Sequence, residues 1–175
     1  MNIRNLAKYL FTFVLYVLII QALIINNINM GYYITPYIYI TFLLILPIEI
    51  PGILLLFLCF GAGITVDMFQ NCPGVHASAS LFLGFMRPFI LKSIAPRDGF
   101  EPGSLPVPAQ LGFAWFFKYA VICTIIHHLF LFIVEAFSFS GMLKVLLKTG
   151  LSSIFTIIFI MILRLFASSG GKRQK

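Results

Sequence analysis

Asp67 is the first residue whose chemistry needs an explanation, because it ends a long uncharged apolar run. A carboxylate at the edge of a membrane segment is costly unless it has a partner, and such groups often mark proton or ligand pathways. A structural use is also open, since His76 and the free backbone N–H groups at the start of a following helix can donate hydrogen bonds to it. The turn-forming residues 71–74 favour the structural use, because they bring a new helix start close to Asp67.

Arg87 is the second such residue, since it lies near the middle of an apolar run and next to Pro88. A guanidinium at that depth is expected to face protein and not lipid. Pro88 leaves the carbonyl of Gly84 without its helical partner. Arg87 is therefore predicted to bond carbonyls freed by this kink, and the alternative is a contact with a partner helix or an anionic lipid headgroup.

His127, His128 and Glu135 raise the question of a metal or catalytic site within residues 112–137. A metal site needs three or four ligands, and helical spacing supplies no third one here. Neither an HEXXH nor a GxSxG pattern occurs. The sequence therefore predicts no catalytic site, no metal and no cofactor. A polar network inside the bundle is expected instead, near Asp67, with the members His76, Ser80, Arg87, His128, Glu135, Lys144 and Lys148.

The composition determines what kind of protein must hold these groups. Hydrophobic residues make up 61% of the 175 residues and charged residues 10%, with a mean hydropathy of +1.04. Soluble domains have about 45–50% apolar and about 25% charged residues. The apolar runs are continuous and not alternating, which favours membrane helices over barrel strands. We therefore expect an all-α integral membrane protein, with a single transmembrane domain over residues 1–170 and a basic tail over 171–175.

Six transmembrane helices are predicted from the apolar runs. Their expected ranges are 6–28, 33–48, 52–70, 75–95, 112–137 and 141–167. The second is confined between Pro36 and Pro47, with Glu49 and Pro51 behind it. Five full spans plus one irregular or re-entrant segment is therefore the alternative count.

The basic residues predict the orientation, because Lys and Arg collect on the cytoplasmic side of membrane proteins. The formal net charge is +7. With six spans one face receives Arg4, Lys8, Lys92, Arg97, Lys118, Arg164, Lys172, Arg173 and Lys175. Both termini and the long Pro-rich loop 96–111 are thus expected in the cytoplasm, and Cys72 outside. The charge follows from this topology and does not indicate nucleic acid. Within the loop, possible contacts for a cytoplasmic partner are Arg97, Asp98 and Glu101.

Small residues predict that residues 52–70 and 75–95 form a closely packed hairpin. Cys59, Gly63 and Asp67 are four residues apart and share one helix face. A facing line in the next helix contains His76, Ser80, Gly84 and Arg87. Small side chains let membrane helices approach closely, so these two faces should meet.

The stretch GAGITVDMFQNCPGVHASASLFLGFMRPF (residues 61–89) resembles the signature region of the rod shape-determining protein MreD family. The motif positions are Gly61, Gly63, Asp67 and Gly74, followed by a small-residue helix. The resemblance implies a six-helix bundle similar to the substrate-binding subunits of energy-coupling-factor transporters. It also implies a non-enzymatic scaffold of the cell-wall elongation complex in the bacterial inner membrane. The implied partners are an MreC-like protein, MreB, RodA, a penicillin-binding transpeptidase and membrane lipid.

Two other functions compete with the scaffold. A vitamin-type transporter subunit shares the implied fold, but such subunits typically carry an AxxxA-like docking motif in the first helix, which residues 6–28 lack. An intramembrane enzyme would need a nucleophile or a metal constellation, and the sequence offers neither.

Overall fold

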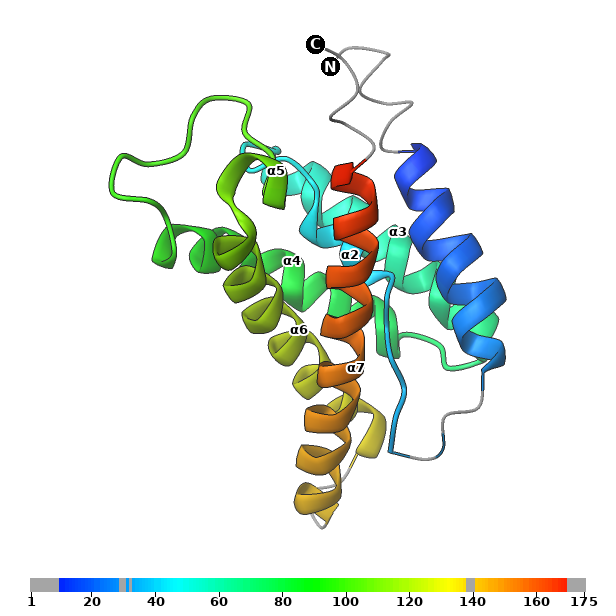
Figure 1. Ribbon diagram of the computed structural model, residues 1–175. Helices are drawn as coiled ribbons and strands as arrows, with labels where there is room; N and C mark the ends of the chain where they lie inside the picture. The colour runs from blue at the N-terminus through cyan, green and yellow to red at the C-terminus, as the bar shows by residue number, and fades with distance from the viewer. Residues whose placement is uncertain (1–9, 29–30, 32, 138–140, 170–175) are drawn as a thin grey trace.

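The computed structural model describes residues 10–28, 31, 33–137 and 141–169, and every regular element in them is a helix (Figure 1). The long helices are the N-terminal helix (Leu10–Asn27), α3 (Gly52–Gln70), α4 (Val75–Ser93), α6 (Phe113–Ala136) and α7 (Met142–Ser169). The N-terminal helix contains a π-helical stretch, Val14–Ile24, and a final 3-10 turn, Ile25–Asn27. Two short helices, α2 (Ile40–Leu44) and α5 (Pro108–Leu111), lie in the connections.

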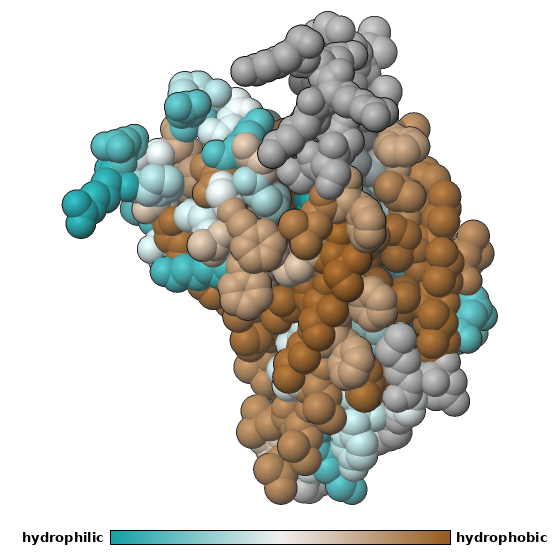
Figure 2. Space-filling model, viewed as in Figure 1, coloured by the Kyte–Doolittle hydropathy of each residue, from teal (hydrophilic) through white to brown (hydrophobic). Residues whose placement is uncertain are grey.

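Four of these helices are long and apolar enough to cross a bilayer, which makes the chain a multi-pass membrane protein. They are Leu10–Asn27, Gly52–Gln70, Phe113–Ala136 and Met142–Ala167. The fifth long helix, α4, includes His76, Arg87 and Lys92 and is less apolar. Figure 2 shows apolar side chains over the visible faces of α7 and the N-terminal helix, whereas many hydrophilic side chains gather at the loop between α4 and α6.

Five of the six predicted helices are present, and the second is not. Of the predicted range 33–48, only Ile40–Leu44 is α-helical. Pro36, Pro47 and Pro51 interrupt this part of the chain, and proline cannot donate the backbone hydrogen bond that a helix interior requires. The count of six helices is therefore not confirmed. The irregular segment of the alternative count is present, but among the described residues four helices, and not five, have the length and hydropathy of a membrane span. The predicted tail 171–175 lies outside the described residues.

The hairpin of α3 and α4 packs through small residues, as the sequence predicted. A methyl group added to Gly63 would lie 2.5 Å from the Cα atom of Ala77 and 2.5 Å from the carbonyl oxygen of His76. A methyl group on Gly84 would lie 2.7 Å from the Cys59 Sγ atom. The backbones of the two helices therefore approach as closely as they do only because these positions carry no side chain.

The irregular segment, residues 33–51, runs through the middle of the molecule (Figure 1). Each residue from 37 to 44 is buried, and Tyr39, Ile40 and Phe42 are 0% exposed. Non-helical backbone at membrane depth is tolerated only where protein or a water-filled cavity surrounds it, because lipid offers no hydrogen-bond partners. Side chains of the surrounding helices must therefore satisfy this backbone.

Gln21 of the N-terminal helix accepts hydrogen bonds from the backbone at the centre of the irregular segment. Its Oε1 atom accepts hydrogen bonds from the backbone N–H groups of Ile38, at 2.6 Å, and Tyr39, at 3.3 Å. Gln21 is 0% exposed, so water cannot take its place. From α7, Ser152 Oγ accepts the N–H of Thr35 at 3.0 Å, and Thr156 Oγ1 accepts the N–H of Tyr37 at 3.1 Å.

Arg87 donates hydrogen bonds to backbone carbonyl groups near the other end of the irregular segment. Its guanidinium donates to the carbonyl oxygens of Leu46 and of Pro47, the latter at 3.1 Å, and to the Tyr119 hydroxyl at 2.8 Å. It is buried and makes no ion pair with any residue that the structure describes. Arg87 thus bonds free carbonyls, but those of the irregular segment and not the predicted carbonyl of Gly84. The local kink misled the prediction, because a buried non-helical segment frees more acceptors than one proline does.

The loop between α4 and α6 is tied to α6 at its start and to the irregular segment at its middle. Trp115 donates from Nε1 to the carbonyl of Ile94 at 2.7 Å, and the N–H of Gly103 donates to Glu49 Oε2 at 3.2 Å. Figure 1 places this loop, the start of the N-terminal helix and the end of α7 at one end of the molecule. The predicted partner contacts Arg97, Asp98 and Glu101 are all exposed there.

Candidate functional site

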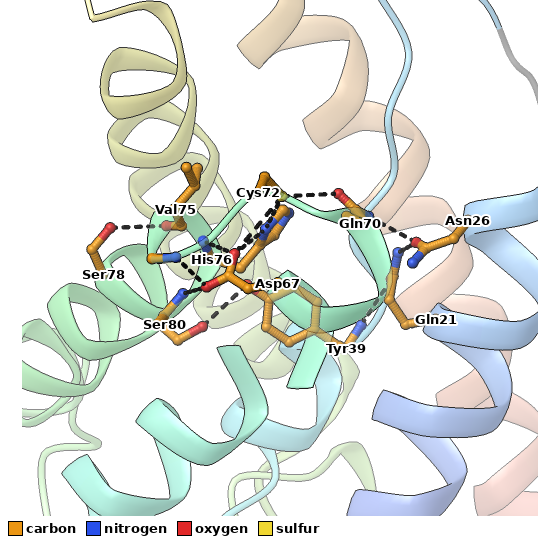
Figure 3. A network of polar contacts seen from close by, with 12 residues as sticks. Gln21, Asn26, Tyr39, Asp67, Gln70, Cys72, Val75, His76, Ser78 and Ser80 are labelled. Atoms are coloured by element: carbon orange, nitrogen blue, oxygen red, sulfur yellow. Dashed lines mark hydrogen bonds and ion pairs between the residues drawn. The ribbon is translucent and has the colours of Figure 1, made fainter. Parts of the chain in front are cut away.

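Asp67 lies in the last turn of α3 and points into the start of α4, where it accepts four hydrogen bonds (Figure 3). Its Oδ2 atom accepts the N–H groups of Gly74 and Ala77, both at 3.0 Å. Its Oδ1 atom accepts the N–H of His76 at 2.8 Å and contacts His76 Nδ1 at 2.9 Å. These N–H groups have no partner within α4, and the positive end of the helix favours an anion. Both partners that the sequence offered to Asp67 are therefore in contact with it.

The turn between α3 and α4 holds this arrangement in place. Asn71 and Gly74 adopt positive φ angles of 53° and 90°, which reverse the chain between the helices. Cys72 lies between them and is partly exposed, and its Sγ atom lies 3.4 Å from His76 Nδ1 and 3.8 Å from Asp67 Oδ1. Burial and the neighbouring Asp67 carboxylate raise the pKa of the Cys72 thiol to about 11. The thiol is therefore protonated at neutral pH.

Asp67, Cys72 and His76 together present three atoms of the kinds that bind metal ions. The sequence prediction lacks this group, because helical spacing within residues 112–137 says nothing about ligands that meet across a turn. The signal was present as an Asp, Cys and His within ten residues around a turn. Tyr37 packs against His76 with its ring centroid at 4.8 Å, and His76 Nε2 is buried without a hydrogen-bond partner among the described residues.

A chain of amide side chains links this site to the N-terminal helix (Figure 3). Gln70 and Gln21 both donate from Nε2 to Asn26 Oδ1 at 2.8 Å. All three line a cleft of about 340 Å³ with Ile25, Asn27, Ile28, Gly31, Ile34, Thr35, Pro36 and Tyr37. The sequence prediction missed Gln21 and Asn26, because single amides in a long apolar run carry no spacing signal.

A second polar chain crosses from the irregular segment to α4 and α6. The hydroxyl of Tyr39 lies 3.1 Å from Ser80 Oγ and 2.7 Å from His127 Nε2. The three residues are 0% exposed. They therefore join three elements in the interior and present no group to a ligand from outside.

His128 has its own partners on α6 and α7. Its Nδ1 atom donates to the carbonyl of Thr124 at 2.9 Å, so Nε2 accepts from Thr156 Oγ1 at 3.2 Å. Since Thr156 Oγ1 also accepts the N–H of Tyr37, one hydroxyl connects the irregular segment to α6. In this tautomer His128 is neutral, and both of its ring nitrogens make hydrogen bonds within the protein.

The structure does not bring the predicted members of the polar network into one cluster. Glu135 and Lys148 form an ion pair at 2.8 Å, in which the Glu135 side chain is 47% exposed. Lys144 is exposed, and Arg87 serves the far end of the irregular segment. Asp67, Arg87 and His128 each bond nearby backbone groups or hydroxyls instead, because leaving such a buried group unpaired is costly.

We expect Asp67→Asn to destabilise the protein by about 1.5–3 kcal/mol, because charge-assisted hydrogen bonds are lost. An asparagine can offer one oxygen only, and its NH2 group must then face backbone N–H donors. Asp67→Leu removes all four bonds and should destabilise the protein further. Thermal unfolding in detergent measures both changes. Equal stability of Asp67→Asn and the parent, with loss of function, would instead show a proton or ligand role.

A comparison of the chain with protein-family models, with curated proteins and with solved structures finds no match. The function of the site has to follow from its own residues and contacts.

Proposed function

We propose that the protein is a non-enzymatic membrane scaffold of the bacterial cell-wall elongation complex, which helps to maintain rod shape together with an MreC-like protein and MreB. The resemblance of residues 61–89 to the MreD family supports this assignment. The observation that carries it is the burial of residues 37–44 at the centre of the bundle, since a scaffold needs outer surfaces and no central binding site.

The irregular segment occupies the space where a transported molecule or a substrate would have to lie. Its residues 37–44 are buried against the N-terminal helix, α4, α6 and α7. Three buried polar side chains of the surrounding helices, Gln21, Thr156 and Arg87, are bonded to this segment. Binding a small molecule there would require displacement of the segment and loss of these bonds. A packed core therefore favours the scaffold over a vitamin-binding transporter subunit.

The surfaces of the molecule offer places for partners. Large apolar side chains are exposed on the membrane helices, among them Phe57, Phe89 and Leu143. They suit contacts with lipid or with the helices of membrane partners such as RodA and the transpeptidase. In this proposal the loop end faces the cytoplasm, where basic residues collect. Arg97 and Asp98 then present both signs of charge to MreB or another cytoplasmic protein, and neither pairs with a described residue.

Depletion of the protein from its host should give rounded cells, and its purification should recover an MreC-like partner. Reversal of both charges, with Arg97→Glu and Asp98→Arg, should weaken association with cytoplasmic partners in a pull-down. The melting temperature should stay unchanged, because both side chains are exposed. Lys144→Glu is the matched control, since this exposed cation lies at the start of α7, away from the loop. Normal cell shape on depletion, with tight binding of a vitamin by the purified protein, would refute the scaffold and support the transporter.

A further inference from the structure

The side chains of Asp67, Cys72 and His76 converge on one point at the turn between α3 and α4 (Figure 3). The separations are 2.9 Å between Oδ1 and Nδ1, 3.4 Å between Sγ and Nδ1, and 3.8 Å between Sγ and Oδ1. Zinc bonds of about 2.0–2.3 Å in a tetrahedron place neighbouring ligand atoms about 3.3–3.6 Å apart. Shifts of a few tenths of an ångström would therefore turn this hydrogen-bonded group into a metal-ligand set.

We propose that Asp67, Cys72 and His76 form a Zn²⁺ site that fastens the hairpin of α3 and α4. In proteins, zinc is bound by Cys thiolate, His imidazole and Asp or Glu carboxylate groups. One thiolate and one carboxylate neutralise the two positive charges of the ion. A neutral site suits this position, where two of the three side chains are buried and an unbalanced charge would be costly.

The carboxylate is already held in the orientation that a metal ligand requires. Three backbone N–H groups, those of Gly74, His76 and Ala77, donate to Asp67 and would remain in place. Such outer contacts orient the ligands of known metal sites. Zinc replaces only the contact between the His76 ring and the carboxylate and the weak contacts of the thiol. Few existing bonds are therefore lost on binding.

The protons balance without any further group. The Cys72 thiol releases its proton to solvent when the thiolate binds the ion. When zinc is bound, the His76 ring carries its proton on Nε2 instead of Nδ1, so that Nδ1 offers a lone pair. His76 Nε2 has no hydrogen-bond partner among the described residues, so this tautomer breaks no bond at that atom. No oxidant or reductant is needed.

The fourth position of the tetrahedron is available next to Gln70. The Oε1 atom of Gln70 lies 3.9 Å from Cys72 Sγ, and Gln70 lines the cleft of about 340 Å³. That oxygen or a water molecule completes the coordination. Cys72 itself is partly exposed, so an ion can reach the site from the surface of the turn.

Metal binding by the full chain in detergent tests this site. After treatment with a chelator, the protein should bind one equivalent of Zn²⁺. Co²⁺, used as a spectroscopic probe, should give the absorption of a thiolate-to-cobalt transition, and Zn²⁺ should abolish it. Zinc should also raise the melting temperature and protect Cys72 from alkylation.

Cys72→Ser is the decisive variant, because this side chain makes only weak contacts and its loss leaves the bonds of Asp67 to α4 intact. It should lose the cobalt transition and bind zinc at least ~10-fold more weakly, and zinc should no longer stabilise it. Cys59→Ser is the matched control, since this buried thiol of α3 lies outside the ligand group. Absence of stoichiometric zinc binding, or equal binding by the parent and Cys72→Ser, would overturn the proposal. Neither result depends on the scaffold function.

Discussion

Gly63→Ala is expected to destabilise the protein by at least about 2 kcal/mol, because overpacking a close helix contact forces the backbones apart. The added methyl group would lie 2.5 Å from the Cα atom of Ala77 and 2.5 Å from the carbonyl oxygen of His76. Both are backbone atoms, so no change of side-chain rotamer can relieve the clash. The displacement would also pull Asp67 away from the N–H groups at the start of α4. A melting curve in detergent, followed by circular dichroism, measures the loss.

Gly61→Ala is the matched control for this change, two residues away in the same helix. No described atom lies within 4 Å of the position that its methyl group would take. Alanine loses less conformational entropy in a helix than glycine does, so this variant should be stabilised by about 0.5–1 kcal/mol. The two substitutions are chemically identical and opposite in expected sign. Similar melting temperatures for both variants would mean that α3 and α4 are not in close contact.

Gln21→Leu is expected to destabilise the protein by about 3 kcal/mol, because buried donors are left without acceptors. The substitution removes the oxygen that accepts the N–H groups of Ile38 and Tyr39. It also removes the donor to Asn26 and to the carbonyl of Pro36. Leucine raises the hydropathy of the N-terminal helix. Membrane insertion considered alone would therefore predict that the variant is more stable than the parent. The fraction of monodisperse protein after heating in detergent is a suitable measurement.

Gln110→Leu provides the comparison for Gln21→Leu. Gln110 also accepts a backbone N–H, that of Leu105, but it lies in an exposed position where water can replace it. Its loss should change stability by no more than about 1 kcal/mol. If the two leucine variants melted at the same temperature, the irregular segment would not depend on Gln21.

The sequence was sufficient for the features that depend on neighbouring residues. The positions of Gly63 and Asp67 on one helix face follow from their spacing of four, and the turn residues 71–74 place His76 within reach. The long helices follow from uninterrupted apolar runs, because each must satisfy its own backbone in lipid. These arguments use only local periodicity, which a single sequence contains.

The irregular segment could not be derived in this way. Several of its backbone partners are far away in the chain, since Ser152 and Thr35 are 117 residues apart and Arg87 and Leu46 are 41 apart. A hydropathy pattern shows that residues 33–48 are apolar. It does not show whether their backbone hydrogen bonds are made within a helix or with surrounding side chains. The ligand group at the turn was missed for a different reason, because Cys72 lies in the turn, outside α3 and α4, where helical periodicity does not say which side chains meet.

The distant partners of the irregular segment also determine when the chain can finish folding during its synthesis. The segment emerges from the ribosome before α4 and long before α7, which supply Arg87, Ser152 and Thr156. Until those helices are inserted, several of its N–H and carbonyl groups have no acceptor or donor in lipid. Helix α3 satisfies its own backbone and can enter the bilayer early, whereas residues 33–51 are expected to complete their hydrogen bonds only after α7 has been made. A chain that stops before α7 should leave this segment accessible to proteases, although most of its helices have already been made.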